Sequence, residues 1–198
     1  MSHYERKDRF YRKAKEQGLP SRASFKIEEM IQRHRLVRPG DTVLDLGAAP
    51  GGWTVILAKA VRPNGKILAM DLAPLAKSAP NVRFLQADIF GTEAAAWLEE
   101  ELGGKKAQAL CSDMSPKLTG IAFKDAYLSY ELAAKALEVA ERWLAPGGNF
   151  VAKIFPGEEF PPFLKELRNH FTTVKVFEPE ATRKTSREVY LLGLGFKG

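Results

Sequence analysis

The chain has one cysteine, three histidines and no long apolar run in its 198 residues. Cys111 alone cannot form an internal disulfide, which fits a reducing cytoplasm, and we expect a cytoplasmic protein. His3, His34 and His170 are scattered and give no zinc-ligand pattern, so no metal site is predicted. An uninterrupted run of about 18 apolar residues, as a membrane span needs, is absent. The charged N-terminus lacks the apolar segment of a secretory signal.

Positive charge is in excess and unevenly distributed. The formal net charge is +6 and the pI is about 9.4. Between Glu5 and Arg35, ten Lys and Arg residues face five acidic ones, so this stretch alone carries +5. Arg183, Lys184 and Arg187 form a second basic cluster. Such clusters suit a polyanion such as RNA, because neutralising phosphates gives affinity for any sequence. A solvated surface has the same composition, so charge only supports an RNA partner.

Strand and helix patterns alternate along the chain, which predicts an α/β fold with a doubly wound, mostly parallel sheet. Two final strand patterns are separated only by a loop, which indicates a terminal antiparallel hairpin. We expect a single domain over residues 1–198, with a basic N-terminal leader and helix at about residues 1–35. The predicted strands are 42–46, 66–70, 82–86, 108–112, 149–155, 174–177 and 188–195, and the predicted helices are 24–35, 53–61, 125–144 and 160–170.

The strongest helical pattern lies in residues 125–144. Its members Leu128, Leu132, Ala136, Val139 and Trp143 recur at spacings of four, four, three and four, which aligns them on one face. We predict that this stripe packs into the core rather than around a cofactor. The Pro-Gly-Gly run at 146–148 is expected to end the helix.

A glycine-rich loop follows the first predicted strand, where open α/β sheets bind their ligands. Its pattern is Gly47-x-x-x-Gly51-Gly52, and Ala49 stands where the dinucleotide pattern G-x-G-x-x-G requires its second glycine. This departure argues against NAD, whose pyrophosphate needs that close approach to a helix N-terminus. S-adenosylmethionine has no phosphate and makes a different demand: acids for its amino group and ribose, and carbonyls for its methionine end.

Three acids follow or end three successive predicted strands. Asp45 could serve the amino group through the loop, and Asp71 lies twenty residues after Gly51, the offset expected of a ribose-binding carboxylate. Asp88 could meet the adenine amino group. Any one of them could be a simple strand-ending cap, but the three together with the loop favour S-adenosylmethionine.

Two charged residues end the strands on either side of the longest helix. Asp113 follows the strand before it and Lys153 lies in the strand after it. The carboxyl ends of adjacent parallel strands meet at one rim of a sheet, so we expect the two side chains to lie together near the loop. Methyl transfer to a hydroxyl needs alignment, and a general base or a partner for the developing oxyanion helps.

The segments VLDLGAAPGGW, SRASFK, CSDMSP, VAKIF and SREVY together resemble the FtsJ/RrmJ family of RNA ribose 2′-O-methyltransferases, and the resemblance covers nearly the whole chain. It implies a seven-stranded Rossmann-like sheet and a catalytic set of Lys26, Asp113, Lys153 and Glu188. In this reading Lys153 takes the 2′-OH proton, Asp113 orients it, and Lys26 with Glu188 positions the ribose. Whether Lys153 is a base or an oxyanion-stabilising cation stays open. The expected cofactor-binding residues are Asp45, Gly47, Ala48, Pro50, Gly51, Gly52, Trp53, Asp71, Asp88 and Asp113.

The resemblance also implies the acceptor. Bacterial members of the family methylate an A-loop uridine of large-subunit 23S rRNA in the assembled subunit, and we expect the same here, by a monomer with no DNA or membrane partner. A tRNA acceptor and a mainly structural ribosome-assembly role remain alternatives. Adenine amino methylation is disfavoured because Asp113-Met114-Ser115-Pro116 lacks the Pro-Pro-aromatic pattern. Cys111 sits in an apolar strand and is expected to be a buried hydrophobe, not a cytosine-attacking nucleophile.

Overall fold

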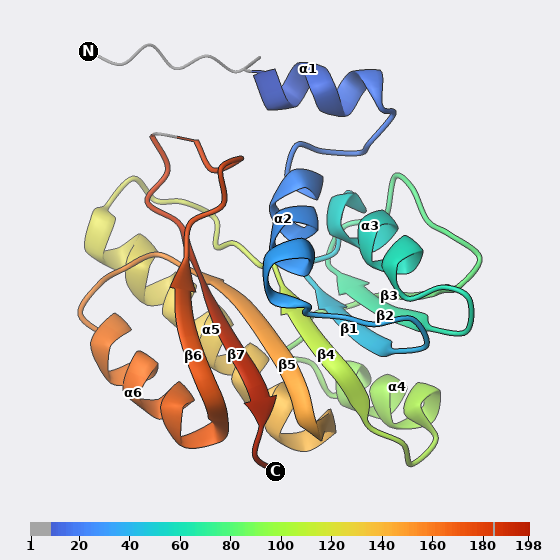
Figure 1. The fold of residues 1–198 in the computed structure, drawn as a ribbon. Coiled ribbons are helices and arrows are strands. Elements are labelled where there is room, and N and C mark those ends of the chain that lie inside the picture. Colours follow the sequence, from blue (N-terminus) through green and yellow to red (C-terminus); the bar gives the residue numbers. More distant parts are fainter. Residues whose placement is uncertain (1–8, 184) are drawn as a thin grey trace.

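A seven-stranded sheet organises the chain, and the computed structural model describes residues 9–183 and 185–198 (Figure 1). The strand order is β3-β2-β1-β4-β5-β7-β6. The first five strands run parallel, as predicted, and the order reverses between β1 and β4. That reversal is the point where doubly wound sheets hold ligands beyond their carboxyl ends. The strands are β1 (Thr42–Leu46), β2 (Lys66–Asp71), β3 (Val82–Gln86), β4 (Ala107–Ser112), β5 (Leu144–Ile154), β6 (Phe171–Phe177) and β7 (Val189–Phe196).

The predicted terminal hairpin is confirmed, with one addition. β7 does not extend the edge of the sheet but lies between β5 and β6, antiparallel to both. It is accordingly buried along most of its length, whereas β6 at the edge alternates exposed and half-buried residues. The position of β7 makes Tyr190 the direct cross-strand neighbour of Lys153.

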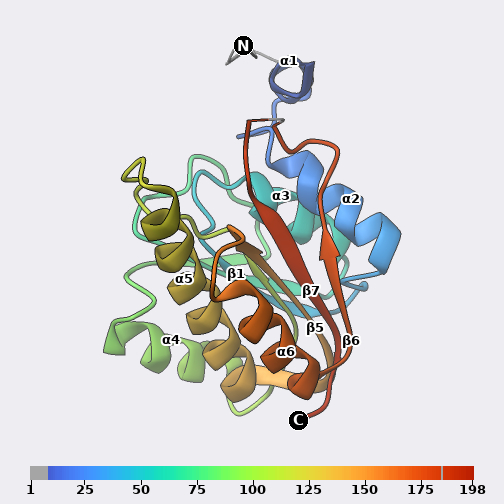
Figure 2. The same ribbon diagram turned by 90° about the vertical axis from the view of Figure 1, so that its left-hand side faces the viewer.

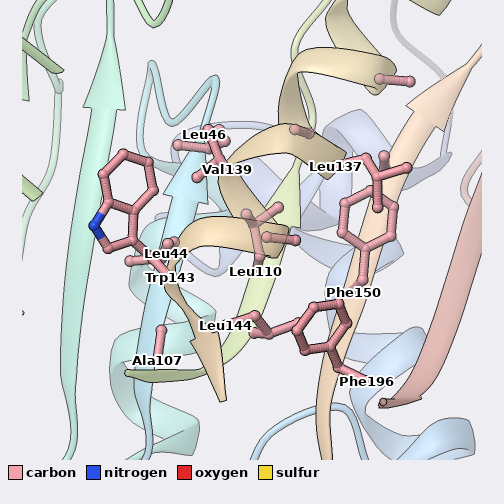
Figure 3. Packing of buried hydrophobic residues seen from close by; sticks show 14 of the residues in the cluster. Leu44, Leu46, Ala107, Leu110, Leu137, Val139, Trp143, Leu144, Phe150 and Phe196 are labelled. Carbon is pink, nitrogen blue, oxygen red and sulfur yellow. The ribbon is translucent and has the colours of Figure 1, made fainter. Parts of the chain in front are cut away.

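Helices cover both faces of the sheet (Figure 2). α2 and α3 pack on one face, where Ile27 and Trp53 bury against strand residues such as Val43 and Val151. The other face is covered by α4, α5 and α6. Figure 3 shows part of that second core, in which Trp143 and Phe150 pack among leucines of β1 and β4. The helices are α1 (Arg9–Glu16), α2 (Ser24–His34), α3 (Gly52–Ala60), α4 (Thr92–Leu102), α5 (Ala122–Trp143) and α6 (Phe160–His170).

The basic leader is two helices rather than one continuous element, and its residues 1–8 lie outside the described part of the chain. α1 stands beyond the sheet in Figure 1. Its Ala14 packs against Phe25 of α2 and against Ala181 in the β6–β7 loop, with Phe10 at the margin. The leader therefore contacts the loop that carries the second basic cluster, of which Lys184 is also undescribed.

Two local predictions were incomplete. Helix α4 was not predicted, although Ala94, Leu98 and Leu102 recur at helical spacing and are buried. The residues 146–148 do not form a separate turn: α5 ends at Trp143, and β5 begins at once with Leu144 and includes them. Cys111 is buried, as expected. Among the described residues no helix is long and apolar enough to cross a membrane.

Candidate active site

A cavity of about 380 Å³ lies at the carboxyl ends of β1 and β2, between the sheet and α5. Three of the residues expected to bind a cofactor, Gly47, Asp71 and Asp88, line it, and the segment after β4 closes another side. Leu128 and Leu132 also line it, so the predicted core stripe of α5 has two parts. Its later members are buried in the core, while its first two face the cavity. The prediction that the whole stripe is core was therefore wrong for those two leucines. The remaining lining residues are Leu46, Met70, Leu72, Ala87, Ile89, Phe90, Met114, Ser115, Pro116, Lys117 and Glu131.

The glycine-rich loop is pressed between neighbouring backbones. Gly47 has φ +75°, and a Cβ there would lie 2.6 Å from the backbone nitrogen of Met114. Gly51 has φ +105°, and a Cβ there would lie 2.5 Å from the carbonyl oxygen of Lys77. Both positions combine a left-handed backbone with a contact that no side chain fits, which is why glycine occupies them. The loop thus brings β1 within contact of the segment after β4.

The other predicted loop residues shape the loop and do not line the cavity. Ala48 and Gly52 are buried, and Pro50 is exposed after a cis Ala49–Pro50 peptide bond. The indole nitrogen of Trp53 donates to the carbonyl oxygen of Ala23 at 3.0 Å. These residues fix the loop against α2.

The acids at the strand ends differ in their surroundings. Asp71 accepts hydrogen bonds from the backbone nitrogens of Ala49 (2.9 Å) and Ala73 (2.8 Å), so its carboxylate ties the loop to the end of β2. Asp88 accepts one from the backbone nitrogen of Phe90 at 3.0 Å. Each carboxylate borders the cavity and retains acceptor capacity toward a ligand hydroxyl or amino group.

Asp45 lies away from the cavity, fully buried beneath the loop. Its Oδ2 accepts a hydrogen bond from the hydroxyl of Thr54 at 2.6 Å, and its Oδ1 has no partner among the described residues. Burial raises the pKa of Asp45 to about 7, the hydrogen bond opposes that shift, and the charges of Asp113 and Asp71 add to it. A buried acid of this kind is uncharged over much of the range in which an ordinary aspartate is ionised.

The four predicted catalytic residues, hereafter the charged cluster (Lys26, Asp113, Lys153 and Glu188), come together from four distant segments. Lys153 Nζ lies 3.1 Å from Asp113 Oδ1 and donates to the backbone oxygen of Asp113 at 2.7 Å. Lys26 of α2 forms an ion pair with Glu188, just before β7. Both lysines are more than nine-tenths buried. Buried lysines paired with carboxylates are costly to assemble and are therefore typical of functional sites.

Tyr190 joins the two ion pairs and was not predicted. Its hydroxyl donates to Asp113 Oδ1 at 2.9 Å and accepts from Lys26 Nζ at 3.2 Å. Burial raises the pKa of Tyr190 well above its ordinary value, and the negative charges of Asp113 and Glu188 add to the shift, so the hydroxyl stays protonated and donates. The signal was present in SREVY: Tyr190 follows Glu188 by two, so strand alternation points both to one face.

Strand register explains why the charged cluster forms. β4 and β5 pair in parallel through Ser112 and Ala152, so the next residue on each strand, Asp113 and Lys153, are neighbours. β5 and β7 pair antiparallel, which sets Tyr190 beside Lys153. Met114 follows Asp113 directly and lines the cavity. Two consecutive residues, Asp113 and Met114, therefore belong to the charged cluster and to the cavity wall, so the two parts of the site are neighbours at the same rim of the sheet.

The sheet order, with β7 antiparallel between β5 and β6, and the cavity at the switch point define a class of protein: the Rossmann-like methyltransferases. The chain belongs to the FtsJ-like methyltransferase family, whose family model matches residues 19–196. It is a member of a methyltransferase family, and the predicted family resemblance is confirmed.

Curated relatives cover nearly the whole chain. "Ribosomal RNA large subunit methyltransferase E" of Anaeromyxobacter dehalogenans is 47% identical over 196 residues, which are 98% of this chain and 73% of that relative. The protein of the same name from Desulfatibacillum aliphaticivorans is 42% identical over 193 residues, covering 97% of this chain and 92% of that relative.

Solved structures share the fold. A crystal structure of a ribosomal RNA methyltransferase from Plasmodium falciparum superposes with a TM-score of 0.81 at 27% identity, covering 90% of this chain and 99% of that one. A fibrillarin/Nop5p complex matches with a TM-score of 0.59 at 22% identity, covering 86% of this chain and 80% of that one, which bears on the fold alone.

Proposed function

We propose that this chain transfers the methyl group of S-adenosylmethionine to a ribose 2′-OH of RNA, in large-subunit 23S rRNA and at an A-loop uridine of the assembled subunit. We propose that it acts as a monomer in the cytoplasm. The observation that carries the proposal is the buried Lys153, paired with Asp113 one residue from the wall of the cavity. The names of the curated relatives support the acceptor.

The residues of the cavity fit the cofactor. Its volume of about 380 Å³ lies in the range of small-molecule sites, and its walls are largely apolar with three carboxylates, Asp71, Asp88 and Glu131. Asp71 is suited to the ribose hydroxyls and Asp88 to the adenine amino group. Gly47 and Met114 both line the cavity, so the methionine end can lie against backbone groups next to Asp113. When bound, the cofactor supplies an electrophilic methyl group on a sulfonium.

The charged cluster would then hold the acceptor. Lys153, once it has given up its proton, accepts the proton of the 2′-OH as the ribose oxygen bonds to the methyl carbon and the carbon–sulfur bond breaks. Asp113 fixes the direction of the Lys153 amine through its side chain and its backbone oxygen. Lys26 and Glu188 hydrogen-bond the ribose from the other side, and Tyr190 keeps the two ion pairs in register. Such alignment of oxygen, carbon and sulfur supplies much of the acceleration of a displacement.

Basic residues of the leader support an RNA acceptor. α1 carries Arg9, Arg12, Lys13 and Lys15 without an acid in its first turn. Because α1 packs on the β6–β7 loop, these cations lie on the side of the molecule that carries Glu188. They would contact phosphates rather than read bases.

The test is transfer of labelled methyl from S-adenosylmethionine to purified large subunits, naked rRNA and tRNA, with the labelled nucleotide mapped. A single 2′-O-methylated uridine in subunits is the expected result. Label on tRNA would retain the chemistry and overturn the acceptor. Tight cofactor binding with no transfer to any of the three RNAs would overturn the catalytic proposal in favour of an assembly role.

A further inference from the structure

A second groove, of about 560 Å³, lies between the first turn of α5 and the loop that follows β5. We call it the aromatic groove, defined by Phe123, Tyr127, Pro156, Gly157, Glu159 and Arg187. Phe123 is 78% exposed and Tyr127 46% exposed. The two rings are four residues apart on a helix, so they lie on one face. The ring of Tyr127 lies 6.1 Å from that of Tyr130, whereas the more exposed Phe123 is not explained by packing in the core.

The aromatic groove is held in shape by specific contacts. A Cβ on Gly157 would lie 2.7 Å from the Cβ of Ala126, so the loop after β5 is seated directly on α5. The backbone nitrogen of Phe155 donates to Ser129 Oγ at 3.0 Å. Asp125 accepts from both the backbone nitrogen and the hydroxyl of Thr119 at 2.7 Å, which fixes the start of α5. The first turns of α5, which carry the exposed rings, are therefore held in place by contacts with the loop after β5 and with Thr119.

The aromatic groove is continuous with the charged cluster. Arg187 and Pro156 also line a neighbouring groove of about 490 Å³, and Glu188 is part of that lining. Arg187 lines the aromatic groove together with Lys124 and Tyr127 of α5, and its charge adds to the hydrogen bonds from Thr119 and Gly120 that lower the pKa of Asp125. A polymer chain that presents a ribose to Glu188 can pass Arg187 and reach Phe123 without leaving the surface.

The chemistry of the aromatic groove selects among occupants. Arg187 and Lys124 line the groove and attract phosphate, while Glu158 and Glu159, which also line it, repel phosphate and accept hydrogen bonds from amino or imino groups. Exposed rings offer a stacking face, which every nucleobase fits. Exposed rings together with cations and hydrogen-bond acceptors suit a nucleotide, whose base can stack on a ring and whose phosphate can pair with a cation.

We propose that the aromatic groove binds an unpaired base of the RNA next to the methylated nucleotide, stacked on Phe123 and Tyr127, with Arg187 at its phosphate. This inference rests on the proposed RNA methyltransferase function and adds a contact that positions the acceptor strand. It assigns a role to side chains outside both the cavity and the charged cluster.

The test compares Phe123→Ala, Phe123→Leu and Phe123→Trp in methyl transfer to large subunits, with Val176→Ala, at an exposed apolar residue on β6, as the control. Loss of the ring should raise KM for subunits about tenfold in the Ala and Leu variants, with kcat and the Kd for S-adenosylmethionine unchanged. The Trp variant and the control should stay within about twofold of wild type. Because Phe123 is exposed, these changes leave the core intact.

A second measurement locates the contact. Subunits carrying 4-thiouridine are irradiated with the protein, digested with nuclease and trypsin, and analysed for peptides bearing a nucleotide. Adducts are expected on the peptides 118–124 and 125–135. An unchanged KM in Phe123→Ala, or adducts confined to other peptides, overturns the inference. So does a Leu variant that behaves as wild type, since an apolar contact with a ribosomal protein would then explain the surface. A wild-type enzyme that transfers no methyl to RNA overturns the proposed function along with it.

Discussion

The two parts of the candidate site are built in different ways. The cavity is lined by segments at the ends of β1, β2, β3 and β4 and by α5, and its shape depends on backbone contacts such as that between Gly47 and Met114. The charged cluster draws its members from α2, β5, the segment after β4 and the segment before β7, and depends on side-chain pairs. Substitutions that add volume should therefore disturb the cavity most, and substitutions that remove a charge or a hydrogen bond should disturb the charged cluster most.

The largest effect is expected from Lys153→Ala. Removing the amine should lower the single-turnover rate of methyl transfer about a thousandfold, as general-base loss does, while the Kd for S-adenosylmethionine stays within about twofold. Transfer of labelled methyl, quenched at successive times, gives the rate, and calorimetry gives the Kd. Lys165→Ala, at an exposed position of α6, is the matched control. Retention of most single-turnover activity by Lys153→Ala would remove the proposed base.

Lys153→Arg sharpens the same question. An arginine keeps the positive charge but cannot take up a proton at ordinary pH. A base at this position predicts that the arginine variant is as slow as the alanine variant. A rate restored well above that of Lys153→Ala would instead assign an oxyanion-stabilising role to the charge.

Gly47→Ala tests the cavity, whose shape depends on backbone contacts. A left-handed backbone strains alanine by about 1–2 kcal/mol, and the close contact with the Met114 backbone adds to this. We expect the free energy of unfolding to fall by about 3 kcal/mol. The matched control is Gly147→Ala, where φ is +79° but nothing lies within 4 Å, so only the strain remains. Urea unfolding measures both, and equal losses would show that the Met114 contact contributes nothing.

Asp45→Asn should change how stability depends on pH. Because the folded-state pKa of about 7 lies above the ordinary value of 3.8, the folded state keeps a proton that the unfolded chain releases. Stability therefore falls as pH rises from about 4 to about 7 and is level above that. The asparagine variant should lack this decline, so its stability relative to wild type should rise by about 3 kcal/mol between pH 5 and pH 8, at about 1.4 kcal/mol for each unit of pKa shift. Unfolding in urea at pH 5 and pH 8 measures it, with the exposed Glu100→Gln as control. A gain of equal size at both pH values would contradict the linkage.

The smallest effect is expected from Tyr190→Phe. The ring stays in the core, but the hydroxyl that joins Asp113 to Lys26 is lost. We expect kcat to fall about tenfold, because the two ion pairs would no longer be held in the alignment that positions the acceptor. We expect the free energy of unfolding to fall by about 1 kcal/mol, because one hydrogen-bonding hydroxyl is lost. Tyr130→Phe, on α5 beside Phe163, is the control. A drop in stability with an unchanged kcat would make Tyr190 purely structural.

Much of the fold was predictable because it depends on periodicity. The sheet, the hairpin and the pairing of Asp113 with Lys153 follow from strand patterns and from the rule that parallel strands end at one rim. Tyr190 was missed because an aromatic residue in a strand reads as core, and only the register of β7 against β5 reveals its hydroxyl partners. Leu128 and Leu132 were assigned to the core because helical spacing defines a face but not what lies opposite each turn of it.

The burial of Asp45 was not predictable either. An acid at the last residue of a strand, such as Asp71, and an acid one residue earlier, such as Asp45, have similar sequence patterns. Whether the side chain is buried depends on how closely the following loop folds over the strand. The segment after β4 was the most informative, because its Asp113 and Met114 serve the charged cluster and the cavity in turn.

The placement of β7 has a consequence for synthesis. A ribosome produces β5 and β6 before β7, so the growing sheet has a gap one strand wide until residues 189–196 emerge. The elements that line the cavity, among them β1, β2 and α5, all precede β7 in the chain, whereas Lys26 and Lys153 acquire Glu188 and Tyr190 only with the last strand. Translation therefore completes the residues of the cavity before it completes the charged cluster.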